Sequence, residues 1–180
     1  NVLTYSIIDD NAEITGCQFL CMPHLIIPEF IDFTKITRIG DGAFYENSQI
    51  TFLTIPDSTV EIGNNAFYRA ANLESVVMGS GVTTIEECAF LLSAINIITL
   101  GESVSTIGPF AFYGNSIAEV IIPESVISIG ASAFSDNALT LVTFLGNRPT
   151  LSRSTSFTNN LNLSAINYCR SKYRWAGDPI

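Results

Sequence analysis

The sequence predicts an α/β repeat solenoid, in which each repeat contributes one short β-strand and one short helical or irregular turn. The main observation is an Ala-Phe pair that recurs along the chain, with intervals of 23, 23, 22 and 22 residues between successive phenylalanines. A period in this range is typical of a solenoid that has one supersecondary unit per repeat. The repeated phenylalanines are Phe44, Phe67, Phe90, Phe112 and Phe134.

A second fixed interval predicts the strand of each repeat. In four consecutive repeats an apolar residue lies 17 residues before the next repeated phenylalanine, and it begins the pattern apolar-x-x-apolar-x-apolar. Alternation that is rich in Val, Ile and Thr indicates a short strand, and the Pro or Gly that follows ends it. The residues predicted to face the core are Leu53, Ile55, Val76, Met78, Ile98, Leu100, Val120, Ile122, Val142 and Phe144.

The segment between each strand and the next phenylalanine predicts a single turn. An Ile-Gly pair, such as Ile62-Gly63, is followed by two variable residues and then by Ala-Phe. This segment is too short for an independent helix and fits one turn that packing stabilises. We expect the glycine to adopt a backbone conformation that a side chain would resist. The repeated phenylalanines should stack into a buried aromatic spine.

The repeats "VTTIEECAF", "VSTIGPFAF" and "VISIGASAF" resemble the BspA-like leucine-rich repeats, also called the Treponema pallidum type. The resemblance covers residues 25–146. It implies a curved, right-handed leucine-rich-repeat superhelix with a parallel β-sheet on the concave face and short helical or irregular turns on the convex side. We expect one continuous domain, cut from a longer protein, with a capping segment at 1–24, repeats at 25–146 of which the first is longer, and a degenerate last repeat and cap at 147–180.

The same resemblance implies a function. Members of this family are bacterial cell-surface or secreted proteins with an inferred role in adhesion or protein–protein interaction. We therefore expect an extracellular or cell-surface, non-catalytic module whose partner is a protein, either of the host extracellular matrix or another surface protein. A family does not fix its ligand, because function depends on the particular site that a fold carries.

The candidate partner-binding residues are those that point away from the core along the predicted strands. Large apolar side chains on a face that meets water often mark an interaction surface. The alternative is that β-branched and aromatic residues occur there because they favour strands. The candidates are Phe52, Thr54, Val77, Ile97, Thr99, Glu119, Ile121, Leu141 and Thr143, and the outward row also contains Ser75.

Charge and hydropathy exclude two classes of partner. Residues 1–147 carry three basic residues against sixteen acidic ones, whereas residues 148–180 carry five basic residues and one acidic. A nucleic-acid-binding protein needs basic residues spread over a docking face. No apolar run approaches the length of a membrane span, and the start of the chain does not have the pattern of a signal peptide. We expect neither nucleic-acid binding nor membrane insertion.

The histidine and the cysteines do not form a recognisable catalytic or metal site. His24 is the only histidine, and no nucleophile motif lies near it, so it is interpreted as a structural or surface residue. Cys88 is interpreted as a packing residue. Cys17 and Cys21 are close enough in sequence to pair in an exported protein, but the sequence leaves the pairing open. No Cys-x-x-Cys pair occurs, so we expect no zinc.

Three acidic residues follow the ends of predicted strands. They could form an acidic stripe or a weak cation site, but solvated loop carboxylates are the preferred interpretation because no oxygen-ligand loop motif accompanies them. No phosphate-binding loop or metalloprotease motif is present either. We expect no catalytic residue, no metal and no cofactor. The acidic residues are Asp57, Glu102 and Glu124.

Two other functions compete with the binding module. The first is a structural spacer with no ligand of its own, which would gain nothing from exposed apolar residues such as Phe52 and Ile97. The second is a β-solenoid enzyme that acts on polysaccharides, which needs converging carboxylates on the strand face. Only Glu119, with Glu74 beside it, is acidic among the outward strand positions.

Overall fold

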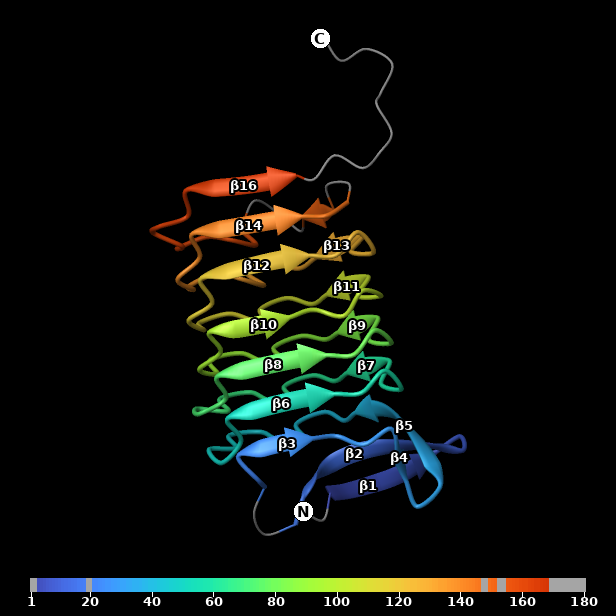
Figure 1. Ribbon diagram of the computed structural model, residues 1–180. Helices are drawn as coiled ribbons and strands as arrows, with labels where there is room; N and C mark the ends of the chain where they lie inside the picture. The colour runs from blue at the N-terminus through green and yellow to red at the C-terminus, as the bar shows by residue number, and fades with distance from the viewer. Residues whose placement is uncertain (1–2, 19–20, 147–148, 152–154, 169–180) are drawn as a thin grey trace, which may run out of the picture.

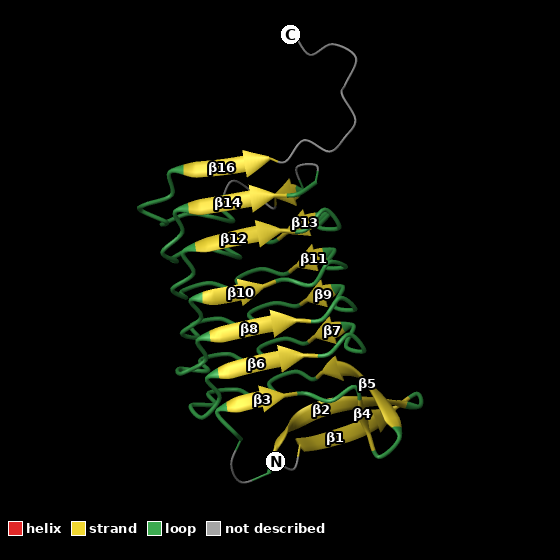
Figure 2. Cartoon of the chain, in the orientation of Figure 1, coloured by secondary structure: helices red, strands yellow, loops and turns green. Residues whose placement is uncertain are grey.

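The chain forms a repeat solenoid with parallel strands, as the sequence predicts, but its described residues contain no helix, so the α/β assignment is wrong. The structure is a computed structural model, and it describes residues 3–18, 21–146, 149–151 and 155–168. Within these ranges it contains sixteen strands and no helix (Figure 2). The resulting fold is a leucine-rich-repeat-like β-solenoid in which parallel strands stack in successive layers (Figure 1).

One parallel ladder, which we call the front sheet, contains the strands that the sequence predicts. Its hydrogen-bonded order is β3, β6, β8, β10 in one part and β12, β14, β16 in the other. The spacing of 22 or 23 residues places equivalent residues side by side, as with Phe52 and Ser75. The strands are β3 (His24–Ile26), β6 (Phe52–Ile55), β8 (Ser75–Met78), β10 (Ile97–Thr99), β12 (Glu119–Ile122), β14 (Leu141–Phe144) and β16 (Ala165–Tyr168).

The other ladder, which we call the back sheet, begins with an antiparallel hairpin of β1 and β2 and continues as parallel strands. Most of its strands are only two residues long, and the sequence pattern did not predict them. The order is β1 (Leu3–Ile8), β2 (Asn11–Cys17), β5 (Thr34–Ile39), β7 (Glu61–Ile62), β9 (Thr84–Ile85), β11 (Thr106–Ile107), β13 (Ser128–Ile129) and β15 (Thr150–Leu151), with β4 (Phe30–Ile31) antiparallel to β5.

Hydrogen bonding between layers explains why the Ala-Phe segments form turns and not helices. The N–H of Phe67 donates to the carbonyl of Ala89 in the next repeat at 2.7 Å, whereas the N–H of Tyr68 closes the turn on Asn65 at 3.0 Å. Alternate N–H groups are therefore used between repeats, and they are not available for the i to i−4 bonds of an α-helix. The same alternation recurs at Phe90 and Leu91.

The aromatic spine is confirmed. The five predicted phenylalanines are buried, and successive rings lie parallel with centroids 4.9 to 5.3 Å apart. Phe157 extends the stack by one ring, at 5.5 Å from Phe134. The inward assignment of the strand residues is also confirmed, with one exception: Ile98 is only half-buried, whereas the equivalent residues of the other strands are buried.

The reason for the Ile-Gly glycine differs from the expected one. Gly63, Gly108 and Gly130 do not adopt positive φ angles; instead, each lies against the backbone or a side chain of the preceding repeat. A Cβ atom added to Gly130 would lie 2.4 Å from the backbone nitrogen of Pro109. The left-handed position falls two residues later, as at Asn65 with φ of 55°. Close approach of layers, and not backbone freedom, favours glycine here, although Glu86 occupies the same position in one repeat.

The cysteines follow the sequence expectations where they are described. Cys17, at the end of β2, forms a disulfide with Cys21, with 5.8 Å between their Cα atoms. This separation is usual for a disulfide. The pairing of Cys17 with Cys21, which the sequence left open, is therefore present in the structure. Cys88 is a free, half-buried cysteine, and burial raises the pKa of its thiol. Cys169 lies outside the described residues.

The outer surface of the back sheet carries an ion cluster around Arg38. The guanidinium of Arg38, on β5, bonds to Glu61 on β7 and to Asp41 at 2.5 Å, and lies 3.1 Å from Glu13 on β2. Arg38 therefore joins three neighbouring segments of the N-terminal part. Further along the same surface, burial raises the pKa of Glu86, and repulsion from the Glu61 carboxylate raises it further.

We expect Glu86→Gln to stabilise the fold at neutral pH by less than about 1 kcal/mol. A carboxyl whose pKa is raised on folding destabilises the folded state above that pKa, and this cost disappears below the ordinary value of 4.5. Urea denaturation at pH 7 and pH 3.5 should therefore show the gain only at pH 7. Glu87→Gln, an exposed neighbour with the same charge change, is the control. An equal gain for Glu86→Gln at both pH values would contradict this account.

Candidate protein-binding surface

The candidate residues all lie on the outward side of the front sheet, where β6, β8, β10, β12 and β14 place them. The large apolar ones are substantially exposed: Phe52 by 41%, Val77 by 44%, Ile97 by 60% and Ile121 by 59%. The polar members Thr54, Thr99 and Glu119 are also exposed, whereas Leu141 and Thr143 are half-buried.

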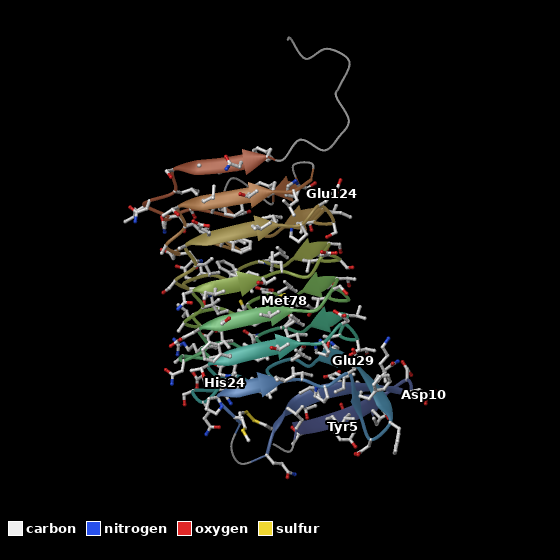
Figure 3. The ribbon with its side chains drawn as sticks, viewed as in Figure 1. Tyr5, Asp10, His24, Glu29, Met78 and Glu124 are labelled. Carbon is white, nitrogen blue, oxygen red and sulfur yellow. A yellow bond between two sulfur atoms is a disulfide. The ribbon has the colours of Figure 1, made fainter. Side chains whose placement is uncertain are left out.

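The structure adds two residues that the sequence interpretation did not include. His24 and Ile26, on β3, pair in register with Phe52 and Thr54 and extend both outward rows by one strand. The rings of His24 and Phe52 lie 4.5 Å apart, and Ile26 is 71% exposed. Figure 3 shows His24 at the start of β3. The sequence could have indicated both residues, because Leu25 and Leu53 occupy equivalent positions in the strands on either side of the long first repeat.

The two sheets differ in the chemistry of their outward residues. In the two-residue back strands β7, β9, β11 and β13 these residues are polar or charged, for example Glu61, Thr84 and Ser128, and they are half-buried. The exposed apolar residues of the back sheet lie at its N-terminal end, as with Ile7 and Ile8 of β1, or just outside the short strands, as with Ile127. Along the front sheet, isoleucine, valine and phenylalanine occupy several outward positions and are exposed. Strand propensity acts on both sheets and does not explain this difference. A row of exposed apolar side chains along several neighbouring strands is typical of an interaction surface.

A pocket of about 620 Å³ adjoins the carboxyl ends of β6, β8 and β10. The acidic residues that line it are Glu29, Asp57 and Glu102. Figure 3 shows Glu29 near the ends of the front strands. Two members of the suggested acidic stripe therefore share this pocket, whereas Glu124 does not line it. The Asp57 carboxylate also accepts the N–H of Ser80 at 2.6 Å, so it has a structural role in joining two repeats.

The structure does not place Glu74 and Glu119, the two carboxylates that the sequence raised for an enzyme, in one pocket. Among the described residues, no group of three or more His, Cys, Asp or Glu side chains is placed to hold a metal ion. Glu119 lines a second pocket, of about 390 Å³, but Glu74 lines neither pocket. The two acidic residues that the sequence raised for polysaccharide chemistry are thus not brought together.

The repeats in this geometry match a known pattern. The BspA type leucine-rich repeat region matches residues 37–164 in six copies. The chain belongs to this family. The sequence resemblance is thereby confirmed, and the repeats extend beyond residue 146 into the segment that was expected to be degenerate.

Solved structures of bacterial leucine-rich repeat proteins have the same fold. TpLRR of T. pallidum is 24% identical with a TM-score of 0.70, and the alignment covers 87% of this chain and 83% of TpLRR. A protein of Bacteroides ovatus is 26% identical with a TM-score of 0.73, covering 92% and 45%. A cell surface protein of Faecalibacterium prausnitzii is 23% identical with a TM-score of 0.57, covering 96% and 54%. The chain spans about half the length of the last two proteins.

No curated protein sequence matches this chain. In the described residues, no helix is long and apolar enough to cross a membrane.

Proposed function

We propose that this domain is a non-catalytic protein-binding or adhesion module of a cell-surface or secreted protein, and that it presents the front sheet to a protein partner. The observation that carries the proposal is the exposure of Phe52, Val77, Ile97 and Ile121 along neighbouring front strands, whereas the short back strands place polar residues such as Glu61 and Thr84 outward. The buried core of a protein interface is enriched in apolar and aromatic side chains, and a few of its residues carry most of the binding free energy.

Two further observations support an extracellular location. One structural relative, from Faecalibacterium prausnitzii, is described as a cell surface protein. The Cys17–Cys21 disulfide is typical of an oxidising compartment. We propose a partner from the host extracellular matrix or another surface protein, and we expect the front sheet to be the concave side of a right-handed superhelix, as the sequence resemblance implies.

The competing proposals are a spacer without a ligand and, less well supported, a polysaccharide-active enzyme. A spacer needs only the stacked core and has no use for an apolar front sheet. An enzyme needs converging carboxylates, which Glu74 and Glu119 do not supply because they do not line a common pocket. Both alternatives predict that changes on the outward face of the front sheet leave protein binding unaffected.

A triple variant tests the proposed function. Phe52→Ser, Val77→Ser and Ile97→Ser together remove exposed apolar side chains from three adjacent strands without altering the core. We expect binding to a matrix protein to weaken by at least about tenfold, because each buried aliphatic or aromatic side chain contributes on the order of 1.5–3 kcal/mol. The measurement is biolayer interferometry of the immobilised domain against purified fibronectin, laminin and collagens.

A matched control variant separates the front sheet from general surface hydrophobicity. Val60→Ser with Ile127→Ser removes exposed apolar side chains that immediately precede β7 and β13 of the back sheet. We expect this variant to bind like the unchanged domain, and both variants to keep its circular dichroism spectrum. Failure of the folded domain to bind any matrix protein in the panel would favour the spacer, and equal losses in both variants would reject the front sheet as the site.

A further inference from the structure

The front sheet is interrupted at one position. Within residues 97–122, all of which are described, no backbone pairing joins β10 to β12, although every other pair of neighbouring front strands is hydrogen-bonded. Figure 1 shows β10 and β12 as the most widely separated neighbours in this ladder. The back sheet is continuous at the same level, because β11 pairs with β13. The layers therefore open on the front side only.

The interruption forms a groove that reaches the hydrophobic core. A pocket of about 390 Å³ lies there, and Ile98 at its wall is half-buried although it occupies a core position of the repeat. The equivalent residues Val76 and Val120 are buried. Apolar surface that is left accessible in this way gains free energy when a ligand removes it from water. The lining residues are Ile98, Thr99, Leu100, Glu102, Glu119, Ile121, Pro123 and Leu145.

The width of the groove determines what can occupy it. Cα atoms of β10 and β12 still lie within 8 Å of each other. Insertion of an additional β-strand would require these two strands to be roughly 9.5 Å apart, which is twice the usual strand spacing. The groove is therefore too narrow for an added strand and fits a side chain from a segment that lies across the sheet.

The described charged residues that line the groove are acidic. Glu102 and Glu119 line it, and the adjacent larger pocket, which shares Thr99, Leu100 and Glu102 with it, adds Glu29 and Asp57. Within the described part of the chain, no lysine, arginine or histidine lines either pocket. Because residues 1–147 carry only three basic residues against sixteen acidic ones, the surrounding surface is also acidic. Such a field attracts cations and disfavours acidic partners.

We propose that the groove between β10 and β12 binds an extended peptide segment of the partner that has one leucine-sized side chain flanked by lysine or arginine residues. The apolar side chain enters the groove against Ile98, and the flanking cations pair with Glu102 and Glu119. This inference rests on the proposed function and specifies which part of the front sheet selects the partner, and by which chemistry.

A synthetic peptide tests the proposal directly. The probe is a fluorescein-labelled peptide with one leucine between two pairs of lysines, titrated by fluorescence polarisation and by ¹⁵N–¹H correlation spectra. We expect shifts concentrated at the amides of Ile98, Thr99, Glu119 and Ile121. Replacing the leucine of the probe with serine should weaken binding by about tenfold or more. Raising the salt concentration should also weaken it, because these charges face solvent.

Variants of the protein separate the groove from general acidity. Glu102→Gln with Glu119→Gln should weaken binding of the probe several-fold, whereas Glu74→Gln with Glu87→Gln, exposed carboxylates outside both pockets, should not. Equal losses in the two double variants, or equal affinity for the leucine and serine peptides, would overturn the proposal. A dimer in light scattering that is abolished by Ile121→Ser would overturn it too, since it would assign the groove to a second copy of the chain.

The failure of this proposal can be distinguished from failure of the proposed function. Phe52, Val77 and Ile97 do not line the groove. If the triple variant loses matrix-protein binding but the peptide does not bind the groove, the front sheet remains the site and the groove is rejected. If the peptide binds the groove as expected and no matrix protein binds, the groove is retained as a peptide-binding site. The extracellular matrix is then rejected as the source of the partner.

Discussion

Phe90→Ala is expected to lower the free energy of unfolding by about 3–5 kcal/mol, the usual cost of replacing a buried phenylalanine with alanine. Phe90 is completely buried, and its ring stacks between those of Phe67 at 5.0 Å and Phe112 at 5.3 Å. The substitution removes a ring from the middle of the spine, and the repeats above and below cannot close the cavity because their backbones are hydrogen-bonded to each other.

Urea denaturation followed by circular dichroism measures this cost. Phe33→Ala is the matched control, because Phe33 is fully exposed in the loop between β4 and β5. This control should change the free energy of unfolding by less than about 0.5 kcal/mol. If both substitutions cost the same, the aromatic spine does not form the core of the solenoid.

The part of the fold that repeats in the sequence could be predicted from it. A buried layer must recur at a fixed interval to stack on its neighbours, so the spacing of Phe67, Phe90 and Phe112 specifies both the period and the buried ring. The alternation along β6 and β12 specifies which side chains face the core. The outward side of the front sheet followed from the same alternation, because the period of a strand is two.

The features that depend on contacts between repeats could not be predicted. Strands of two residues, such as Thr84–Ile85, are too short to show a periodicity, and they exist only because the neighbouring layers pair with them. The N–H of Phe67 bonds to the next repeat, whereas the N–H of Tyr68 bonds within its own turn. The pattern of one repeat does not reveal a bond to the next, so it could not exclude a helical turn. The sequence also could not predict where on the front sheet a groove would form.

The groove illustrates this limit most clearly. The repeat containing Ile98 has the same pattern as its neighbours, and the sequence predicts it to be as buried as Val76. Whether two strands pair depends on the relative placement of consecutive layers, which the local pattern does not encode. His24 was missed for a different reason, because the long first repeat concealed its equivalence to Phe52.

Asn115→Ala is expected to lower the free energy of unfolding by about 2–6 kcal/mol, since it leaves two buried backbone groups without partners at roughly 1–3 kcal/mol each. The Asn115 side-chain oxygen accepts the N–H of Ile95 at 3.0 Å, and its NH₂ group donates to the carbonyl of Phe90 at 2.8 Å. Asn137 repeats both contacts one layer further on, with Ile117 and Phe112. Each of these two asparagines thus joins the phenylalanine of the preceding repeat to the residue that begins the strand segment after it.

Hydrogen exchange distinguishes this role from simple loss of packing. In the Asn115→Ala variant the amide of Ile95 should exchange much faster than in the unchanged protein, whereas the amide of Ile117, which Asn137 bonds, should lose protection only as far as global stability falls. Asn96→Ala, on an exposed residue of the adjoining segment, is the control and should leave both amides and the unfolding midpoint unchanged. Retained protection of Ile95 in the Asn115 variant would show that another group satisfies its N–H, and that the asparagine contributes by volume alone.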